Sequence, residues 1–240
     1  MSEMTTYPRL LIYGASGTGK THFLGTCPKP YVFDFDNGIE TLTGMGVPFQ
    51  SDLYEPLDLG TWDRFDKKLR NFEEGRVAGV RTLSIDSLTA LCDCAEARVL
   101  SLNKHDILHK EQSDWGMEIS LIEQVMYRLN QASKHYHVVV TAHEQLKEDL
   151  VRGETFVVPI VSGKVLPFAL PKWFTEVYRL FTDRTKERKP DYKMLTCADR
   201  RYSAKSRLGG LEETDVPDYG QLLKRYIIRP KSEPVAATGG

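Results

Sequence analysis

Short apolar runs rich in β-branched and aromatic residues alternate along this chain with longer stretches in which hydrophobic and polar positions are mixed. Four such runs predict buried strands, at residues 9–13, 31–35, 82–85 and 138–141. The mixed stretches predict helices, at residues 20–25, 61–72, 88–102 and 115–134. Strands that alternate with helices are typical of a parallel sheet covered on both faces.

The pattern changes after residue 141. A polar stretch is followed by a short predicted helix at 165–170 and by strand-like runs at 176–181 and 192–196, for which antiparallel pairing is the simplest explanation. We therefore predict an α/β fold, with a mostly parallel central sheet flanked by helices and antiparallel strands added toward the C-terminus. Residues 1–228 are predicted to form one domain. Residues 229–240, rich in Pro, Gly and Ala without periodicity, are predicted to form a disordered tail.

Composition narrows the class of protein. Of the 240 residues, 41% are hydrophobic, which suffices for one substantial core. The 32 basic and 33 acidic side chains leave a formal net charge of -1, so a nucleic acid would have to be held by a local patch. The four cysteines lack CxxC spacing, and neither a signal segment nor a membrane-spanning apolar run is found. We therefore expect a cytoplasmic protein with reduced thiols and no membrane association.

The most specific motif is GASGTGKT at residues 14–21, which matches GxxxxGK[ST] between a predicted strand and a predicted helix. Small side chains let a phosphate approach the backbone N–H groups, and the positive end of the following helix adds to the attraction. Lys20 would reach the β- and γ-phosphates of ATP, and the Thr21 hydroxyl would bind Mg²⁺. A glycine-rich turn that matches by chance is the alternative. The residues expected to hold ATP here are Gly14, Ala15, Ser16, Gly17, Thr18, Gly19, Lys20 and Thr21.

Two acidic residues follow predicted strands. Asp86 ends the third strand and is expected to be the second magnesium ligand, although it could instead cap the helix that follows. Asp36 lies one step beyond the second strand and is expected to activate the water that attacks the nucleotide. Glu40 is the second candidate for that role, and ordinary turn chemistry at Asp-Asn-Gly is the alternative.

Five motifs occur in a characteristic order, namely GASGTGKT, VFDFDNGIE, LSIDSLTAL, VVVTAHEQ and AKSRLGG. This order, over residues 10–210, resembles the RecA-like branch of P-loop ATPases, and most closely the phage Sak-type single-strand annealing recombinases. The resemblance implies ATP and Mg²⁺ as cofactors and hydrolysis stimulated by DNA. It also puts Asp36 where the family carries its catalytic acid, which is usually a glutamate.

The resemblance assigns roles to two later motifs. His143 and Glu144 fall at the polar pair that senses the γ-phosphate, so His143 is expected to contact the nucleotide and Glu144 to take part in catalysis. A hydrogen-bonded histidine at a strand end is the alternative for His143. Lys205 and Arg207 fall where two cations reach the γ-phosphate of the neighbouring subunit, which implies a homo-oligomer, either a ring or a filament. A solvated basic run is the alternative for this segment.

These features together predict an ATP-dependent recombinase that assembles on single-stranded DNA and promotes annealing or strand exchange, in the host cytoplasm if it is phage-encoded. A single-strand-binding protein is a candidate further partner. The alternatives are a RecA-like helicase, a regulatory ATPase and a small-molecule kinase. Candidate DNA contacts lie in two polar segments, and they are Lys104, His105, His109, Lys110, Lys147, Arg152 and Phe156. Trp115 is expected to anchor its helix in the core.

Overall fold

The computed structural model describes residues 7–149, 153–185, 187–208 and 210–227. The tail predicted at 229–240 and the predicted domain end at 228 lie outside these described residues. Within the described ranges, nine strands form the sheet. They are β1 (Arg9–Gly14), β2 (Pro30–Asp34), β3 (Gln50–Leu53), β4 (Thr82–Asp86), β5 (His137–Asp149), β6 (Glu154–Pro159), β7 (Glu176–Arg184), β8 (Pro190–Leu195) and β9 (Thr214–Asp215).

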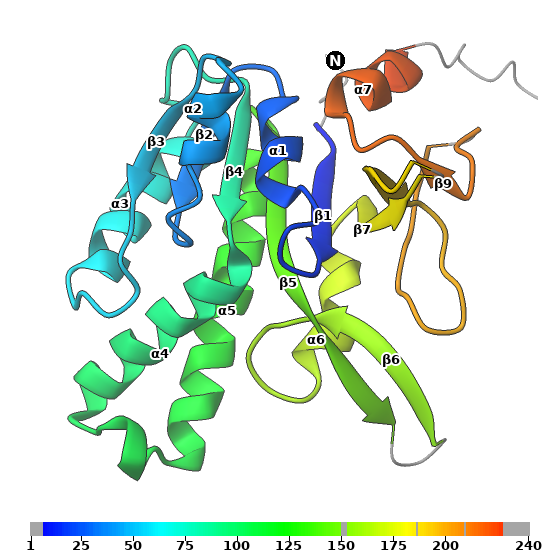
Figure 1. Cartoon of the computed structure of the whole chain (residues 1–240). Helices are drawn as coiled ribbons and strands as arrows, with labels where there is room; N and C mark the ends of the chain where they lie inside the picture. The colour runs from blue at the N-terminus through cyan, green and yellow to red at the C-terminus, as the bar shows by residue number, and fades with distance from the viewer. Residues whose placement is uncertain (1–6, 150–152, 186, 209, 228–240) are drawn as a thin grey trace, which may run out of the picture.

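The strand order is β3-β2-β4-β5-β1-β7-β8-β9, with β6 paired to β5 (Figure 1). Pairing is parallel from β3 through β1 to β7, and antiparallel for β7 with β8, β8 with β9 and β5 with β6. The predicted fold class is therefore confirmed.

Helices cover both faces of this sheet. The helices are α1 (Lys20–Gly25), α2 (Glu40–Gly44), α3 (Thr61–Glu73), α4 (Leu88–Asn103), α5 (Gln112–Ala132), α6 (Leu166–Ala169) and α7 (Tyr219–Ile227), with 3₁₀ turns at η1 (Ile107–His109) and η2 (Leu170–Trp173). None of the helices in the described ranges is long and apolar enough to cross a bilayer.

Strand β1 shows how the apolar runs create two cores. Successive side chains of a strand point to opposite faces, so Leu11 and Tyr13 pack with α3, α4 and α5. Leu10 and Ile12 pack on the other face with α1, α2 and α7. Because both faces are buried, the parallel strands need continuous apolar runs, and this is the signal by which the sequence predicts them.

The register of the parallel strands brings separated polar residues to one edge of the sheet. Gly14 at the end of β1 lies opposite His143 of β5, and Asp34 at the end of β2 lies opposite Asp86 of β4. Ligands of open α/β sheets bind at this carboxyl edge. The fold therefore gathers the predicted nucleotide residues at a single place.

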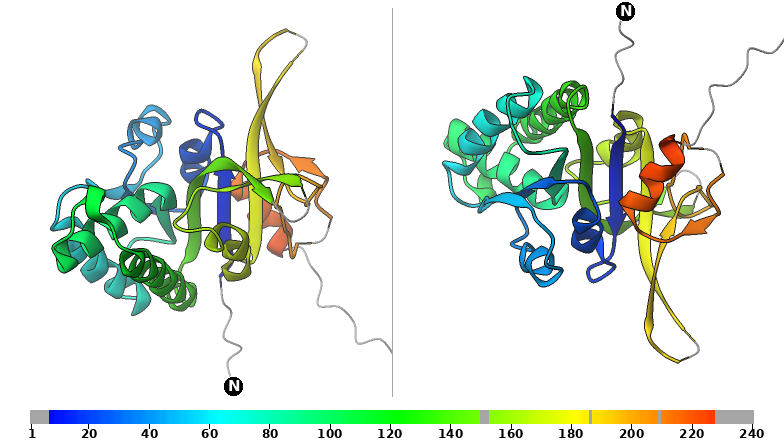
Figure 2. Two further views of the ribbon diagram at one scale, coloured as in Figure 1. Left: turned by 90° about the horizontal axis from the view of Figure 1, so that it is seen from below. Right: turned by 90° about the horizontal axis from the view of Figure 1, so that it is seen from above.

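Two antiparallel hairpins extend from the sheet. The β7–β8 hairpin, drawn in yellow, projects far beyond the helices in both views of Figure 2. The β5–β6 hairpin continues β5 past its predicted end at 141 as far as Asp149 (Figure 1). Both hairpins start from the carboxyl edge that carries the candidate site.

Candidate nucleotide-binding site

The phosphate loop joins β1 to α1 along a path that requires glycine. Gly17 and Gly19 have φ of 77° and 89°, values that other residues rarely adopt. A Cβ on Gly14 would lie 2.4 Å from the carbonyl oxygen of Leu180 in β7, so a larger residue would clash with the backbone. These three positions explain why the loop contains so few side chains.

Lys20 is the buried cation of the loop. Its Nζ donates hydrogen bonds to the carbonyl oxygens of Gly14, at 3.0 Å, and Ala15, at 2.8 Å. Burial lowers the pKa of Lys20, and the nearby carboxylates of Asp86 and Asp36 oppose this shift. An ammonium group among carbonyls and carboxylates at the mouth of a glycine-rich loop is suited to neutralise a phosphate.

Thr21 and Asp86 meet beside this lysine. The Thr21 hydroxyl donates a 2.7 Å hydrogen bond to Oδ2 of Asp86, and the Thr141 hydroxyl donates to the other carboxylate oxygen. Asp86 is buried, which raises its pKa, while these two hydrogen bonds lower it. The alternative cap role belongs instead to Ser87, whose hydroxyl accepts from the N–H of Ala90 at 3.4 Å.

A hydroxyl and a carboxylate are oxygen donors of the kind that Mg²⁺ prefers. No group of three His, Cys, Asp or Glu side chains within the described residues could hold a metal by itself. A magnesium ion held by Thr21 and Asp86 would therefore need oxygen atoms from the nucleotide and water, as is usual for this metal. The donor set fits magnesium delivered with ATP.

Asp36 lies just beyond β2 and pairs with His143 of β5, with 3.2 Å between Oδ2 and Nε2. Burial raises the pKa of Asp36, but hydrogen bonds from His143 and Ser87 outweigh that effect and lower it overall. Asp34 is buried and accepts from the N–H of Gly38 at 3.1 Å, so it stabilises the turn. Asp36 is therefore the acid of this strand end that faces the cleft.

Glu144 follows His143 but its carboxylate binds Arg179 of β7. Two hydrogen bonds, of 2.7 and 3.0 Å, join the guanidinium to the carboxylate, and their side chains are 15% and 14% exposed. The Arg179 guanidinium also lies 4.0 Å from the centre of the Tyr202 ring. Glu144 thus connects the strand of His143 to β7, and its predicted catalytic role stays a prediction.

Lys205 and Arg207 lie away from this cleft. Lys205 pairs with Val177 near the start of β7, and its Nζ donates to the Pro171 carbonyl at 2.7 Å. Arg207 is exposed, and its backbone N–H donates to the Glu176 carboxylate at 3.2 Å. Glu176 lies opposite Leu10, four residues before the phosphate loop. At ~3.3 Å per residue, the two cations are therefore roughly 13 Å along the sheet from their own phosphate loop.

The cleft has a volume of about 990 Å³ and brings together the loop, Asp36, Asp86 and His143. A second wall that the sequence did not predict completes it. The residues of this wall include Pro190, Asp191, Tyr192, Val216, Pro217 and Asp218. No motif marks these positions, because they come from two segments that meet only in the folded chain.

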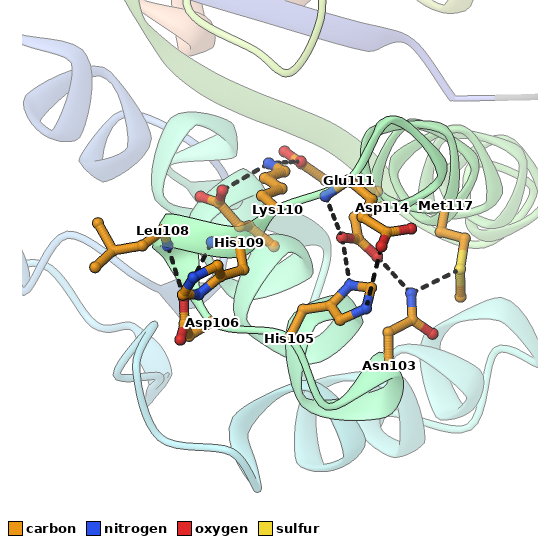
Figure 3. Close-up of polar contacts among 11 residues, drawn as sticks. Asn103, His105, Asp106, Leu108, His109, Lys110, Glu111, Asp114 and Met117 are labelled. Atoms are coloured by element: carbon orange, nitrogen blue, oxygen red, sulfur yellow. Dashed lines mark hydrogen bonds and ion pairs between the residues drawn. The ribbon is translucent and has the colours of Figure 1, made fainter.

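The first candidate DNA segment is largely occupied by its own ion pairs (Figure 3). Lys110 is only 12% exposed and binds Glu96 at 2.6 Å and Glu118 at 2.8 Å. Nδ1 of His105 lies 2.8 Å from the buried Asp114. Lys110 is therefore not available to a phosphate without breaking two ion pairs.

One expectation for this segment, that Trp115 anchors its helix in the core, is wrong. Trp115 is 50% exposed and lies 4.4 Å from Nζ of Lys110, so it does not anchor α5 in the core. His105 and His109 do not share a helix, because α4 ends at Asn103 and His109 lies in η1, where it pairs with Asp106 at 2.8 Å.

The second candidate DNA segment remains open to solvent in part. Leu146 on β5 is 69% exposed, and Nζ of Lys147 donates to the Gly163 carbonyl at 2.9 Å. The ring of Phe156 on β6 lies 6.1 Å from that of Phe168, which is 48% exposed. Arg152 lies outside the described residues. The β5–β6 hairpin and the adjoining α6 therefore combine a cation with accessible apolar and aromatic groups.

Comparison with known proteins assigns the family. A family model described as an AAA domain matches residues 6–208, which is more than half of the chain, and the chain therefore belongs to this family. Together with the phosphate loop, this membership makes the chain a P-loop ATPase. Its finer activity is not part of that assignment.

Among solved structures, the chain is similar to a RadB recombinase. The two are 16% identical, the match covers 79% of this chain and 81% of that one, and the TM-score is 0.45. Similarity of this size does not bear on function. None of the curated proteins matches the chain in sequence.

Proposed function

We propose that this ATPase is a recombinase of the phage single-strand annealing type, which binds single-stranded DNA and promotes annealing or strand exchange between complementary strands. ATP with Mg²⁺ would favour the DNA-bound, assembled state. It would act in the cytoplasm, that of the host if it is phage-encoded, with a single-strand-binding protein as a further partner.

The observation that supports ATP hydrolysis is that the side chains of Lys20, Thr21, Asp86 and Asp36 meet at one edge of the sheet. Lys20 would neutralise the β- and γ-phosphates, and Thr21 with Asp86 would hold the magnesium ion, which draws electron density from the phosphate oxygens when bound. The pKa of Asp36 is lowered, mainly by its hydrogen bonds to His143 and Ser87, so its carboxylate form is favoured, and this form would orient a water molecule by accepting a hydrogen bond from it. His143 is hydrogen-bonded to Asp36, which orients the carboxylate, and it would contact the terminal phosphate of a bound nucleotide.

The position of Lys205 and Arg207 supports an oligomer. Because both lie near the opposite edge of the sheet, they would complete an active site only in a neighbouring subunit. An exposed Arg207 costs little to move toward an external phosphate. Lys205 would first have to leave the Pro171 carbonyl, so assembly would include a local rearrangement of this segment.

The route from nucleotide to DNA follows β5. His143 contacts Asp36 at the cleft, and Leu146 and Lys147 follow on the same strand within the β5–β6 hairpin. Exposed apolar and aromatic groups beside lysine suit single-stranded DNA, because bases stack on rings and phosphates pair with cations. A shift of His143 on nucleotide binding would therefore act directly on this hairpin.

Steady-state ATP hydrolysis, measured with and without single-stranded DNA, tests this proposal, and annealing of complementary oligonucleotides is followed in the same samples. We expect stimulation by DNA and ATP-dependent annealing. Asp36→Asn should lower kcat by roughly 10²- to 10⁴-fold, the usual contribution of a general base. Asp34→Asn is unsuitable as a control because Asp34 holds the turn, so Asp93→Asn, an exposed carboxylate on α4, serves as the control. A hydrolysis rate that is the same with and without single-stranded DNA, together with annealing that is the same with and without ATP, would refute the proposal.

A further inference from the structure

The second wall of the nucleotide cleft is not explained by phosphate binding. It is formed by the first residues of β8 and by the segment between β9 and α7. The cleft volume of about 990 Å³ is at the upper end of the range for small-molecule sites. The space beyond the phosphate loop is therefore large enough for the rest of a nucleotide.

Tyr192 is the central residue of this wall. A Cβ placed on Gly19 would lie 3.5 Å from Cδ1 and 3.9 Å from Cε1 of the Tyr192 ring, so the ring packs on the last glycine of the phosphate loop. The residue is nevertheless 45% exposed, which leaves part of the ring open to the cleft. An accessible ring beside a phosphate site is suited to stack on a nucleobase.

The ring of Tyr192 is held in place by the base of the β7–β8 hairpin. Tyr192 pairs with Thr182 across the β7–β8 ladder. The next residue, Lys193, makes ion pairs of 3.2 Å to Asp183 and 3.3 Å to Asp191. The pairing of β7 with β8 therefore positions Tyr192 before any ligand binds, which reduces the entropic cost of stacking.

The segment between β9 and α7 contributes an apolar part of this wall, which is also anchored. Val216 and Pro217 line the cleft, and the N–H of Tyr219 just beyond them donates a 2.8 Å hydrogen bond to Oγ1 of Thr26. Tyr219 itself is fully buried. Since Thr26 caps α1, this segment is tied to the helix that follows the phosphate loop.

The wall also carries two carboxylates. Asp191 and Asp218 line the cleft together with Tyr192. Carboxylates repel phosphate, but they accept hydrogen bonds from hydroxyl and amino groups such as those of a ribose or a base. Asp218 also accepts from the N–H of Gln221 at 3.0 Å, which fixes its orientation.

We propose that this wall is the base and ribose subsite of the cleft, with Tyr192 stacking on the nucleobase and Asp191 and Asp218 accepting hydrogen bonds from the nucleoside. The inference rests on the proposed function only in requiring that a nucleotide occupies the phosphate loop. Because Tyr192 belongs to the β7–β8 hairpin, an occupied base subsite also immobilises this hairpin.

Isothermal titration of Mg²⁺-ATP and of Mg²⁺-tripolyphosphate, which has the phosphates but no nucleoside, tests the subsite. We expect Tyr192→Ala to weaken ATP binding by about 5- to 150-fold, as for loss of one base–aromatic stack, and to leave tripolyphosphate binding unchanged. Tyr192→Phe, which keeps the ring, should bind ATP like the wild type. Hydrogen exchange of the Thr182 and Tyr192 amides should slow with ATP and not with tripolyphosphate.

The outcomes separate this inference from the proposed function. If Tyr192→Ala binds ATP as tightly as the wild type, or loses both ligands equally, the base subsite is refuted while the phosphate loop stands. If the wild type binds neither ligand, the ATPase proposal fails and the subsite fails with it. The exchange measurement on the wild type decides the matter even where the alanine variant does not fold.

Discussion

The carboxylate of Glu144 and the guanidinium of Arg179 form a two-point ion pair that joins β5, the strand of His143, to β7. Both side chains are about 85% buried, at 14% and 15% exposure. Arg179→Ala would leave the Glu144 charge buried and unpaired, so we expect a loss of ~3–5 kcal/mol in the free energy of unfolding. Urea unfolding measures this loss.

Lys193→Ala is the control for that variant, because it removes more exposed ion pairs from the neighbouring strand β8. Exposed pairs contribute little, so its unfolding curve should stay close to that of the wild type. Equal stability of Arg179→Ala and the wild type would show that the ion pair is not needed to hold the two strands.

Asp86 should act through magnesium. Asp86→Asn keeps the shape of the side chain and one of the two oxygens that accept from Thr21 and Thr141 but removes the charge, so the magnesium concentration for half-maximal hydrolysis should rise by about 10- to 100-fold. Asp93→Asn, an exposed carboxylate on α4, should leave it unchanged. An Asp86→Asn enzyme with the wild-type magnesium dependence would remove this residue from the metal site.

Arg207 should act on the nucleotide of another subunit. Alone, Arg207→Ala should lose hydrolysis under assembling conditions, by about 10³-fold or more if it resembles other trans-acting arginines. Mixing it with Lys20→Ala should restore part of the rate, because mixed assemblies contain sites with an intact loop and an intact arginine. Arg200→Ala, exposed in the preceding segment, is the control. Absence of any recovery on mixing would contradict a shared site.

Acid should destabilise the fold through His137. Burial and the nearby Arg81 lower the pKa of His137 to about 4, and Tyr219 contacts its Nδ1 at 2.8 Å. An unfolded histidine has a pKa of roughly 6.5. The unfolded state therefore binds more protons between these values, and stability should fall as the pH drops from about 6.5 to 4.

Urea unfolding at several pH values between 4 and 7 tests this expectation. His137→Asn cannot titrate, so its stability should fall less over this range than that of the wild type. The exposed His135→Asn should follow the wild type. Parallel curves for the wild type and His137→Asn would rule out a contribution from this residue.

The elements that the sequence predicted best are those whose environment is uniform. Strands β1, β2 and β4 are buried on both faces, so their apolar runs are unmistakable. Strand β3 was missed because each of its four residues is exposed at a sheet edge. Strand β6 and the far half of β5 were missed because their hairpin is only partly buried, with Val157 and Val158 buried but Leu146 69% exposed.

The site divides in the same way. Gly14, Asp86, Asp36 and His143 could be predicted together, because parallel strands bring their carboxyl ends to one edge. The wall around Tyr192 could not, since it depends on contacts between segments far apart in the chain. Trp115 was predicted to lie in the core but is half exposed, because a tryptophan at the start of a helix can pack on a lysine instead.

The central claim is that triphosphate held at residues 14–21 switches the protein to a DNA-binding state. Fluorescence anisotropy of a labelled single-stranded oligonucleotide, with and without a non-hydrolysable ATP analogue, measures it most directly. The account predicts at least about tenfold tighter DNA binding with the analogue for the wild type, a coupling of ~1.4 kcal/mol, and no response for Lys20→Ala. DNA affinity that is the same with and without nucleotide in the wild type would contradict it.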